Sequence, residues 1–190
     1  MTSQNIRKMV ITAILIALTI VFQLLRPVLG GTNIVSTYIV GSLVNLVLIV
    51  AACVVGLWSG VAVAVIAPLF AVLQNHAQLP MVPWIIAGNL VLVVLFALFA
   101  LKDHALKVDW VRWVIVGVIA TVLKYAVITL GMTLVQTAAT GKAFSVILGV
   151  AAGAQSVQIV TALIATVLGG FILPMLPAST LGLGNGKAKA

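Results

Sequence analysis

Residues 111–136 read VRWVIVGVIATVLKYAVITLGMTLVQ, an apolar run with a single lysine, Lys124, near its middle. A charge at the centre of a bilayer costs about 2.5–3.5 kcal/mol on insertion scales, so such a residue indicates a functional site that faces protein or water. At helical periodicity Tyr125, Thr129 and Gln136 lie on the same side as this lysine. We therefore expect Lys124 to line a polar cavity. The alternatives are a lysine bonded to backbone carbonyl groups of a neighbouring helix, or one that snorkels to an interface.

The composition around this run is that of an integral membrane protein. Of the 190 residues, 64% are hydrophobic and 6% are charged, which is more apolar surface than a water-soluble domain can bury. Apart from Lys124, the formal net charge of +8 comes from basic residues at the ends of apolar runs, so it follows membrane topology and does not indicate nucleic-acid binding. We expect one integral membrane domain over residues 1–190, with a flexible cytoplasmic tail over about 177–190.

Six apolar runs are long enough to cross about 30 Å of hydrocarbon as α-helices. They are residues 9–25, 38–55, 57–74, 81–101, 111–136 and 146–176. The second and third are separated only by a tight turn over 56–60, because a single helix across both would be far too long to span a bilayer. The pattern predicts an all-α membrane protein, a six-transmembrane-helix bundle.

The basic residues orient the predicted bundle. With the N-terminus in the cytoplasm, the inside set is Arg7, Lys8, Lys102, Lys107, Arg112, Lys187 and Lys189, and the outside set is Arg26 and Lys142. Both termini are then cytoplasmic. The basic start and the apolar run after it loosely resemble a signal peptide, but the length of the run and its polar end favour a first helix that is retained.

In this orientation the strongly polar side chains of the spans lie between the membrane midplane and the outer face. They are Gln23, Asn45, Gln74, Asn89, Lys124, Gln136, Gln155 and Gln158. The inner halves offer only threonine, serine and glycine as polar or small residues. Because all six spans contribute to this bias, we expect a hydrogen-bonding pocket that opens to the outside.

The inventory of reactive side chains argues against an enzyme. The two acids, Asp103 and Asp109, fall on one predicted cytoplasmic loop, so the spans hold no carboxylate pair for acid–base chemistry. His76 and His104 fall on opposite sides of the membrane, which excludes a metal cluster of conventional spacing. The sequence has no Walker A or G-x-S-x-G motif, and no intramembrane acids that could relay protons. Uphill transport would therefore need energy from another subunit.

The length, the six spans, the basic N-terminus and the AxxxA pattern of Ala13 and Ala17 resemble the substrate-binding S-component of energy-coupling factor (ECF) vitamin transporters. The stretch PWIIAGN at 83–89 also resembles a pattern in the branch that handles small vitamins and precursors, and the resemblance covers residues 6–176. It implies a non-catalytic subunit in the plasma membrane of a bacterium, with no cofactor of its own. The implied partners are a transmembrane T-component and two cytoplasmic ATPases, which hold ATP and Mg²⁺.

The resemblance also implies roles for individual residues. Ala13 and Ala17 would meet the T-component, since small residues four apart let helices approach closely. Gly149 and Gly153 form a similar pair at the start of the sixth span, with internal packing as the alternative. Helices 4 to 6 and the loop after helix 1 would supply the ligand site. By position this points to Trp84, Asn89, Lys124, Tyr125, Gln155 and Gln158.

Absent residue types narrow the expected ligand. No acid faces the predicted pocket, which disfavours thiamin-like cations, and Thr2 stands where nickel and cobalt members of the family present a histidine. Our first expectation is a heteroaromatic alcohol such as hydroxymethylpyrimidine or pyridoxine, stacked on Trp84 or Tyr125. Pantothenate or nicotinate is the alternative, because either would give Lys124 a carboxylate partner. Hypotheses of other classes are a membrane scaffold or assembly subunit without a ligand, and a passive channel.

Overall fold

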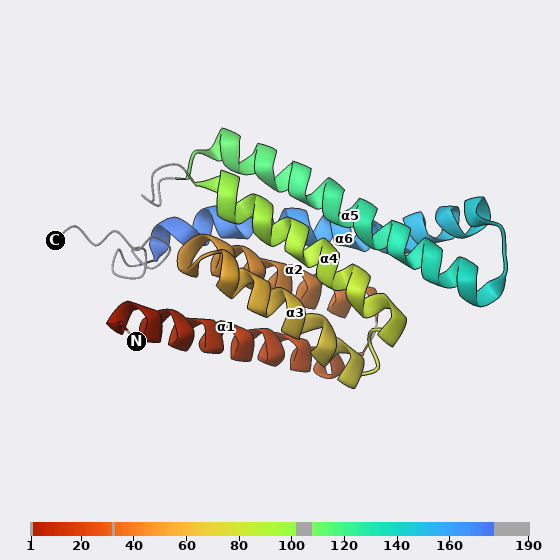
Figure 1. Cartoon of the computed structure of the whole chain (residues 1–190), viewed down its shortest axis with the longest axis horizontal. Helices are drawn as coiled ribbons and strands as arrows, with labels where there is room; N and C mark the ends of the chain where they lie inside the picture. The colour runs from red at the N-terminus through yellow and green to blue at the C-terminus, as the bar shows by residue number, and fades with distance from the viewer. Residues whose placement is uncertain (1, 32, 102–107, 177–190) are drawn as a thin grey trace.

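A computed structural model describes residues 2–31, 33–101 and 108–176 of the chain. These residues form a bundle of six α-helices (Figure 1). The helices are α1 (Ser3–Val28), α2 (Ile34–Val50), α3 (Leu57–Leu73), α4 (Val82–Leu95), α5 (Trp110–Thr140) and α6 (Phe144–Ile172). The π-helical segments η1 (Ala51–Val55) and η3 (Phe96–Ala100) extend α2 and α4, and the 3-10 segments η2 (Leu79–Met81) and η4 (Leu173–Met175) flank α4 and α6.

All six predicted runs are helical, which confirms the prediction of an all-α membrane protein. Five of the helices, counted with their short extensions, are long and apolar enough to cross a membrane. The sixth, α3, has 17 residues, or about 25 Å at 1.5 Å per residue, which is the lower limit for a span. Helix α1 continues past its predicted end at residue 25, so Arg26 belongs to the helix.

Consecutive helices alternate in direction, so the start of α1 and the end of α6 lie at the same end of the bundle (Figure 1). We call this the inner end and the opposite one the outer end, after the predicted orientation. Arg7, Lys8 and Arg112 lie at the inner end, and Arg26 and Lys142 lie at the outer end, as the charge pattern predicts. Which end faces the cytoplasm stays a prediction. The predicted tail and Lys102, Asp103, His104, Lys107, Lys187 and Lys189 lie outside the described residues.

The apolar core occupies mainly the inner half of the bundle. Trp113 of α5 is fully buried there, with its ring centroid 4.9 Å from that of Phe96 in an edge-to-face arrangement. Its Nε1 donates a hydrogen bond of 2.7 Å to the backbone oxygen of Thr166, which satisfies the one polar group that the indole brings into the core. Leu48, Val63 and Leu92 of the neighbouring helices are also fully buried. The outer half is therefore free to hold polar side chains.

Two glycines permit backbone arrangements that other residues would not. Gly56 has φ 122° and is the whole connection between η1 and α3, so the predicted turn over 56–60 contracts to one residue. Gly131 of α5 lies under Trp84 of α4, where an added Cβ would approach the indole Cγ to 2.1 Å. This close approach fixes how α4 and α5 pack in the outer half.

Candidate functional site

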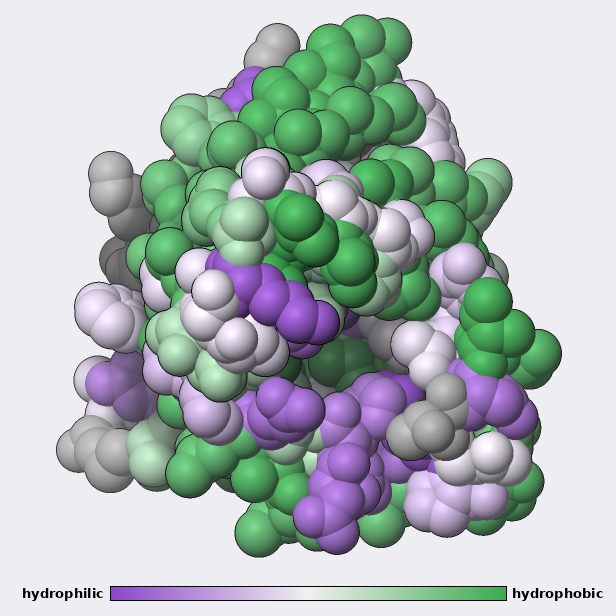
Figure 2. Space-filling view, turned by 90° about the vertical axis from the view of Figure 1, so that its right-hand side faces the viewer, coloured by the Kyte–Doolittle hydropathy of each residue, from purple (hydrophilic) through white to green (hydrophobic). Residues whose placement is uncertain are grey.

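A cavity of about 400 Å³, which we call the outer cavity, lies in the outer half of the bundle. Residues from all six helices and from the connection between α3 and α4 line it. Figure 2 looks onto the outer end, where hydrophilic side chains surround a hollow. The cavity is lined by all of the strongly polar residues that the sequence places in the predicted pocket, with the exception of Gln74. Its volume is in the range of small-molecule sites, about 300–1,000 Å³.

Lys124 lies deep in the outer cavity and is only 2% exposed. Its Nζ donates a hydrogen bond of 2.5 Å to Oδ1 of Asn45 on α2. The Nδ2 of Asn45 donates in turn to Oγ1 of Thr161 on α6, at 3.2 Å. A lysine amino group in its charged form has three N–H donors, and Asn45 is its one partner among the described residues. The remaining donor capacity is available to a ligand in the cavity.

A second group of polar residues lies where α1 ends and α3 connects to α4. Gln23 is 4% exposed, and its Nε2 donates to the backbone oxygen of Ala67 at 3.0 Å. Several buried polar atoms in this group have no hydrogen-bond partner among the described residues: Oε1 of Gln23, Nε and Nη1 of Arg26, and Nδ1 of His76. Because buried polar groups are nearly always paired, these atoms indicate a place for water or for polar groups of a ligand.

His76 is uncharged at neutral pH in this environment. Burial of its ring, and secondly the positive charge of Arg26, lower the pKa of His76 from 6.5 to about 4. The residue lies in the connection between α3 and η2, and its side chain is half-buried beside the outer cavity. The neutral imidazole can donate one hydrogen bond and accept another, so it adds polarity to the site without adding charge.

The structure places four of the six predicted ligand residues around one cavity. Asn89, Lys124, Gln155 and Gln158 line it from α4, α5 and α6. The Nε2 of Gln155 lies 3.0 Å from the sulfur of Met132, another lining residue.

The other two predicted ligand residues lie at helix contacts and are not among the lining residues. Trp84 covers Gly131 of α5. Tyr125 donates a hydrogen bond of 3.0 Å from its hydroxyl to the backbone oxygen of Ala152 on α6. The roles of all six residues in ligand binding stay predictions.

Further polar lining residues are absent from the predicted ligand set, among them Asn45, Arg26 and His76. Asn45 is the only amide side chain in its predicted span, and the sequence places it in the predicted pocket but not in the ligand set. The charge pattern alone makes Arg26 a topology marker, and only the extension of α1 past residue 25 brings it to the cavity. The sequence offers no signal for His76 beyond its position after the third apolar run.

Together, the six apolar helices and the polar outer cavity define a multi-pass membrane protein with a solute-sized site. Residues 7–177 match the family model described as ECF transporter, substrate-specific component, and the chain belongs to this family. It is therefore a non-catalytic binding subunit that works with other ECF transporter subunits, as the resemblance in the sequence predicts. Comparisons with curated proteins and with solved structures found no match to this chain.

Proposed function

We propose that the chain binds a small anionic, vitamin-like solute in the outer cavity and delivers it to an ATP-driven ECF importer. In this proposal both termini are cytoplasmic and the cavity opens to the outside of the cell. Residues 1–190 form one membrane unit with a cytoplasmic tail, and two partner ATPases hold the ATP and Mg²⁺.

The observation that carries the proposal is the charge around the outer cavity. Lys124 and Arg26 both line it, and none of its described lining residues is acidic. Burying a charge is costly unless the charge is paired. A carboxylate beside Lys124 would supply the missing counter-charge and accept charge-assisted hydrogen bonds from its amino group. Arg26 offers two more buried donors that lack a partner among the described residues.

The remaining polar residues suit a ligand with several hydrogen-bonding groups. Asn89, Gln136, Gln155 and Gln158 bring amides, each of which can donate and accept. Pantothenate, with a carboxylate, an amide and hydroxyls, fits this set, and nicotinate fits the charged part of it. A stacked heteroaromatic alcohol has less support, because among the described lining residues the ring of His76 is the only aromatic one.

Matched pairs of compounds test the charge requirement. The purified full chain would be unfolded thermally with pantothenate or pantothenol, with nicotinate or nicotinamide, and with hydroxymethylpyrimidine or pyridoxine. A ligand at 100 times its Kd stabilises the folded state by about 2.7 kcal/mol. We expect one acid to raise the melting temperature while its neutral partner does not.

Two other outcomes would change the assignment. Stabilisation by hydroxymethylpyrimidine or pyridoxine alone would contradict the proposal of an anionic ligand. A heteroaromatic alcohol would then be the favoured ligand class. No stabilisation by any compound, together with no small molecule in the mass spectrum of the purified chain, would favour the scaffold subunit.

The partner surface is proposed on α1. Ala13 and Ala17 are exposed, whereas Leu15 and Thr19 on the opposite side of the helix are buried. Ala13→Leu or Ala17→Leu should therefore abolish co-purification with the T-component and leave ligand binding unchanged, because only the close approach of the partner helix is blocked. Val10→Leu, at an exposed and already bulky position of α1, is the matched control. Loss of ligand binding in the alanine variants would show that these residues support the internal packing instead.

A further inference from the structure

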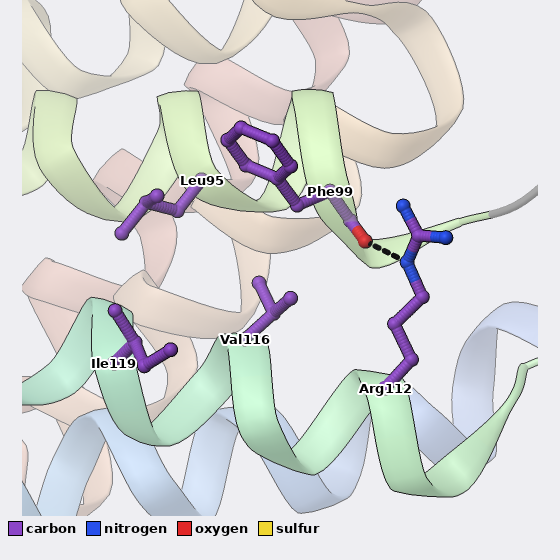
Figure 3. Close-up of a pocket in the computed structure, with 5 residues that line it drawn as sticks. All are labelled: Leu95, Phe99, Arg112, Val116 and Ile119. Atoms are coloured by element: carbon purple, nitrogen blue, oxygen red, sulfur yellow. Dashed lines mark hydrogen bonds between the residues drawn. The ribbon is translucent and has the colours of Figure 1, made fainter.

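A second hollow, which we call the inner groove, lies between the inner ends of two helices. It has a volume of about 410 Å³ and is lined by Leu95, Phe99, Arg112, Val116 and Ile119. Figure 3 shows the apolar side chains of α4, η3 and α5 on either side of the gap, with Arg112 at one end of it. None of these five residues lines the outer cavity, so the inner groove is a separate feature.

The groove opens onto a surface that is apolar on both helices. Phe99 is 49% exposed and Ile119 is 47% exposed. The neighbouring residues of α5 that face outward are also apolar and exposed: Val111, Val114, Ile115, Val118 and Val122. In a membrane protein such a surface contacts lipid, and acyl chains fill its grooves because an empty groove forfeits dispersion contacts.

Arg112 closes the end of the groove nearest the inner end of the bundle. Its Nε donates a hydrogen bond to the backbone oxygen of Phe99 (Figure 3). Phe99 is in the last turn of η3, where carbonyl groups lack intrahelical partners, so the arginine satisfies an acceptor left by the helix end. The terminal nitrogens of Arg112 point away from the apolar side chains in this view, toward the end of the groove.

Neighbouring residues place Arg112 near the surface of the bilayer. Trp110 precedes it at the start of α5 and is 43% exposed, and Trp58 at the start of α3 is 81% exposed. Exposed tryptophans at helix ends mark the membrane interface. Ile119 lies seven positions after Arg112, or about 10 Å along the helix, which is about two thirds of one leaflet of the hydrocarbon.

The local charge also suits an anion. Asp109 is the nearest acid among the described residues, and its carboxylate accepts hydrogen bonds from the backbone N–H groups of Val111 and Arg112, at 3.1 and 3.4 Å. It therefore caps the helix, while the Phe99 carbonyl is the hydrogen-bond partner of the guanidinium among the described residues. The guanidinium N–H groups that have no partner in the described part of the chain are well suited to phosphate.

We propose that the inner groove binds one anionic phospholipid, with an acyl chain along Leu95, Val116 and Ile119 and the headgroup phosphate on Arg112. The site is independent of the ligand in the outer cavity. The positive charge selects anionic over zwitterionic lipid, by about fivefold for one basic residue at a membrane surface. The apolar lining holds the acyl chain whatever its headgroup.

Native mass spectrometry of the purified full chain tests the proposal with two probes that have the same acyl chains, phosphatidylglycerol and phosphatidylcholine. The wild-type chain should retain one phosphatidylglycerol with about fivefold preference. Arg112→Gln should remove the preference and Arg112→Lys should keep part of it. Arg7→Gln removes the same charge from an exposed residue at the same end of the bundle, outside the groove, and should leave the preference unchanged.

A variant that fills the groove distinguishes the contribution of the acyl chain to lipid binding from that of the charge. Ile119→Trp adds bulk at an exposed position of the lining and should reduce retention of both lipids. Equal retention of the two lipids by the wild-type chain would overturn the proposal and leave the groove to a helix of a partner subunit. An equal loss of preference in Arg7→Gln and Arg112→Gln would also overturn it, because the selectivity would then come from the overall charge.

Discussion

The outer cavity and the inner groove have nearly the same volume, about 400 and 410 Å³, but very different linings. The outer cavity collects amide and basic side chains from five helices, α3 adding only apolar residues, and several of its buried polar atoms lack partners among the described residues. The inner groove lies between two helices, and four of its five lining residues are apolar. Volume alone therefore does not identify an occupant. The polar atoms that face each hollow predict a water-soluble anion in one and a lipid in the other.

The difference between the two hollows is tested most directly by removing the charge deep in the outer cavity. Lys124→Met keeps an unbranched side chain only one atom shorter and should weaken binding of the acid ligand by about 10- to 100-fold, the value of a hydrogen bond to a charged group. The neutral analogue should lose much less. Isothermal titration calorimetry measures both, and Lys142→Met at the outer end, exposed and outside the cavity, is the matched control. Undiminished binding of the acid would exclude Lys124 from the site.

The packing that supports the outer cavity can be tested at Gly131. Gly131→Ala should lower the free energy of unfolding by about 1–3 kcal/mol, because its Cβ would overlap the ring of Trp84. Gly149→Ala on α6 meets no atom within 4 Å and should stabilise the helix by about 0.5–1 kcal/mol. Thermal unfolding of the two variants compares them directly. Similar stabilities would mean that Trp84 can move away from α5.

An acid placed inside the outer cavity should imitate the proposed ligand. Asn45→Asp puts a carboxylate at the position of the oxygen that now accepts the hydrogen bond from Lys124. We expect a higher melting temperature without ligand, and acid binding weakened about tenfold, because the counter-charge is already present. Asn89→Asp, a lining residue that has no hydrogen bond to Lys124 among the described residues, serves as the comparison. If Asn45→Asp bound the acid as tightly as the wild type, Lys124 would not be its partner.

Protonation of His76 should make a small contribution to the pH dependence of stability. Because the folded state lowers the pKa of His76 to about 4, the unfolded chain binds more protons between pH 6.5 and pH 4. Stability should therefore fall as the pH drops through this window, and the fall should be shallower in His76→Gln. Melting temperatures of the ligand-free chain from pH 7 to pH 5 measure the difference. Parallel curves for the two proteins would show that His76 does not titrate in this environment.

The helices and the location of the polar pocket could be predicted from the sequence because both depend on averages over long apolar runs. An apolar run of about 20 residues has few alternatives to a membrane helix, and polar residues at one depth favour a shared cavity. The family model then confirmed the substrate-binding class that the sequence predicts.

Individual side chains were harder to predict because they depend on helix ends and on neighbouring helices. Tyr125 follows Lys124 on α5, yet its hydroxyl donates a hydrogen bond to a backbone carbonyl of α6, and the residue does not line the cavity. Trp84 is held by Gly131, a contact between residues 47 positions apart that no local pattern signals. The position of Arg26 at the cavity could be predicted only with the observed end of α1, which lies beyond the predicted one. Helix rotation and pairing are properties of the folded bundle, so residue spacing within one helix cannot supply them.

The length of the last two helices has a practical consequence. With 31 residues, α5 is about 46 Å long, well beyond the thickness of the hydrocarbon, and its connection to α6 projects past the other helices (Figure 1). Gly141, Lys142 and Ala143 form this connection, and all three are exposed. An epitope tag inserted in this connection can therefore report the orientation of the chain in living cells. An antibody that does not enter the cell would bind the tag only if this end of the bundle faces the medium.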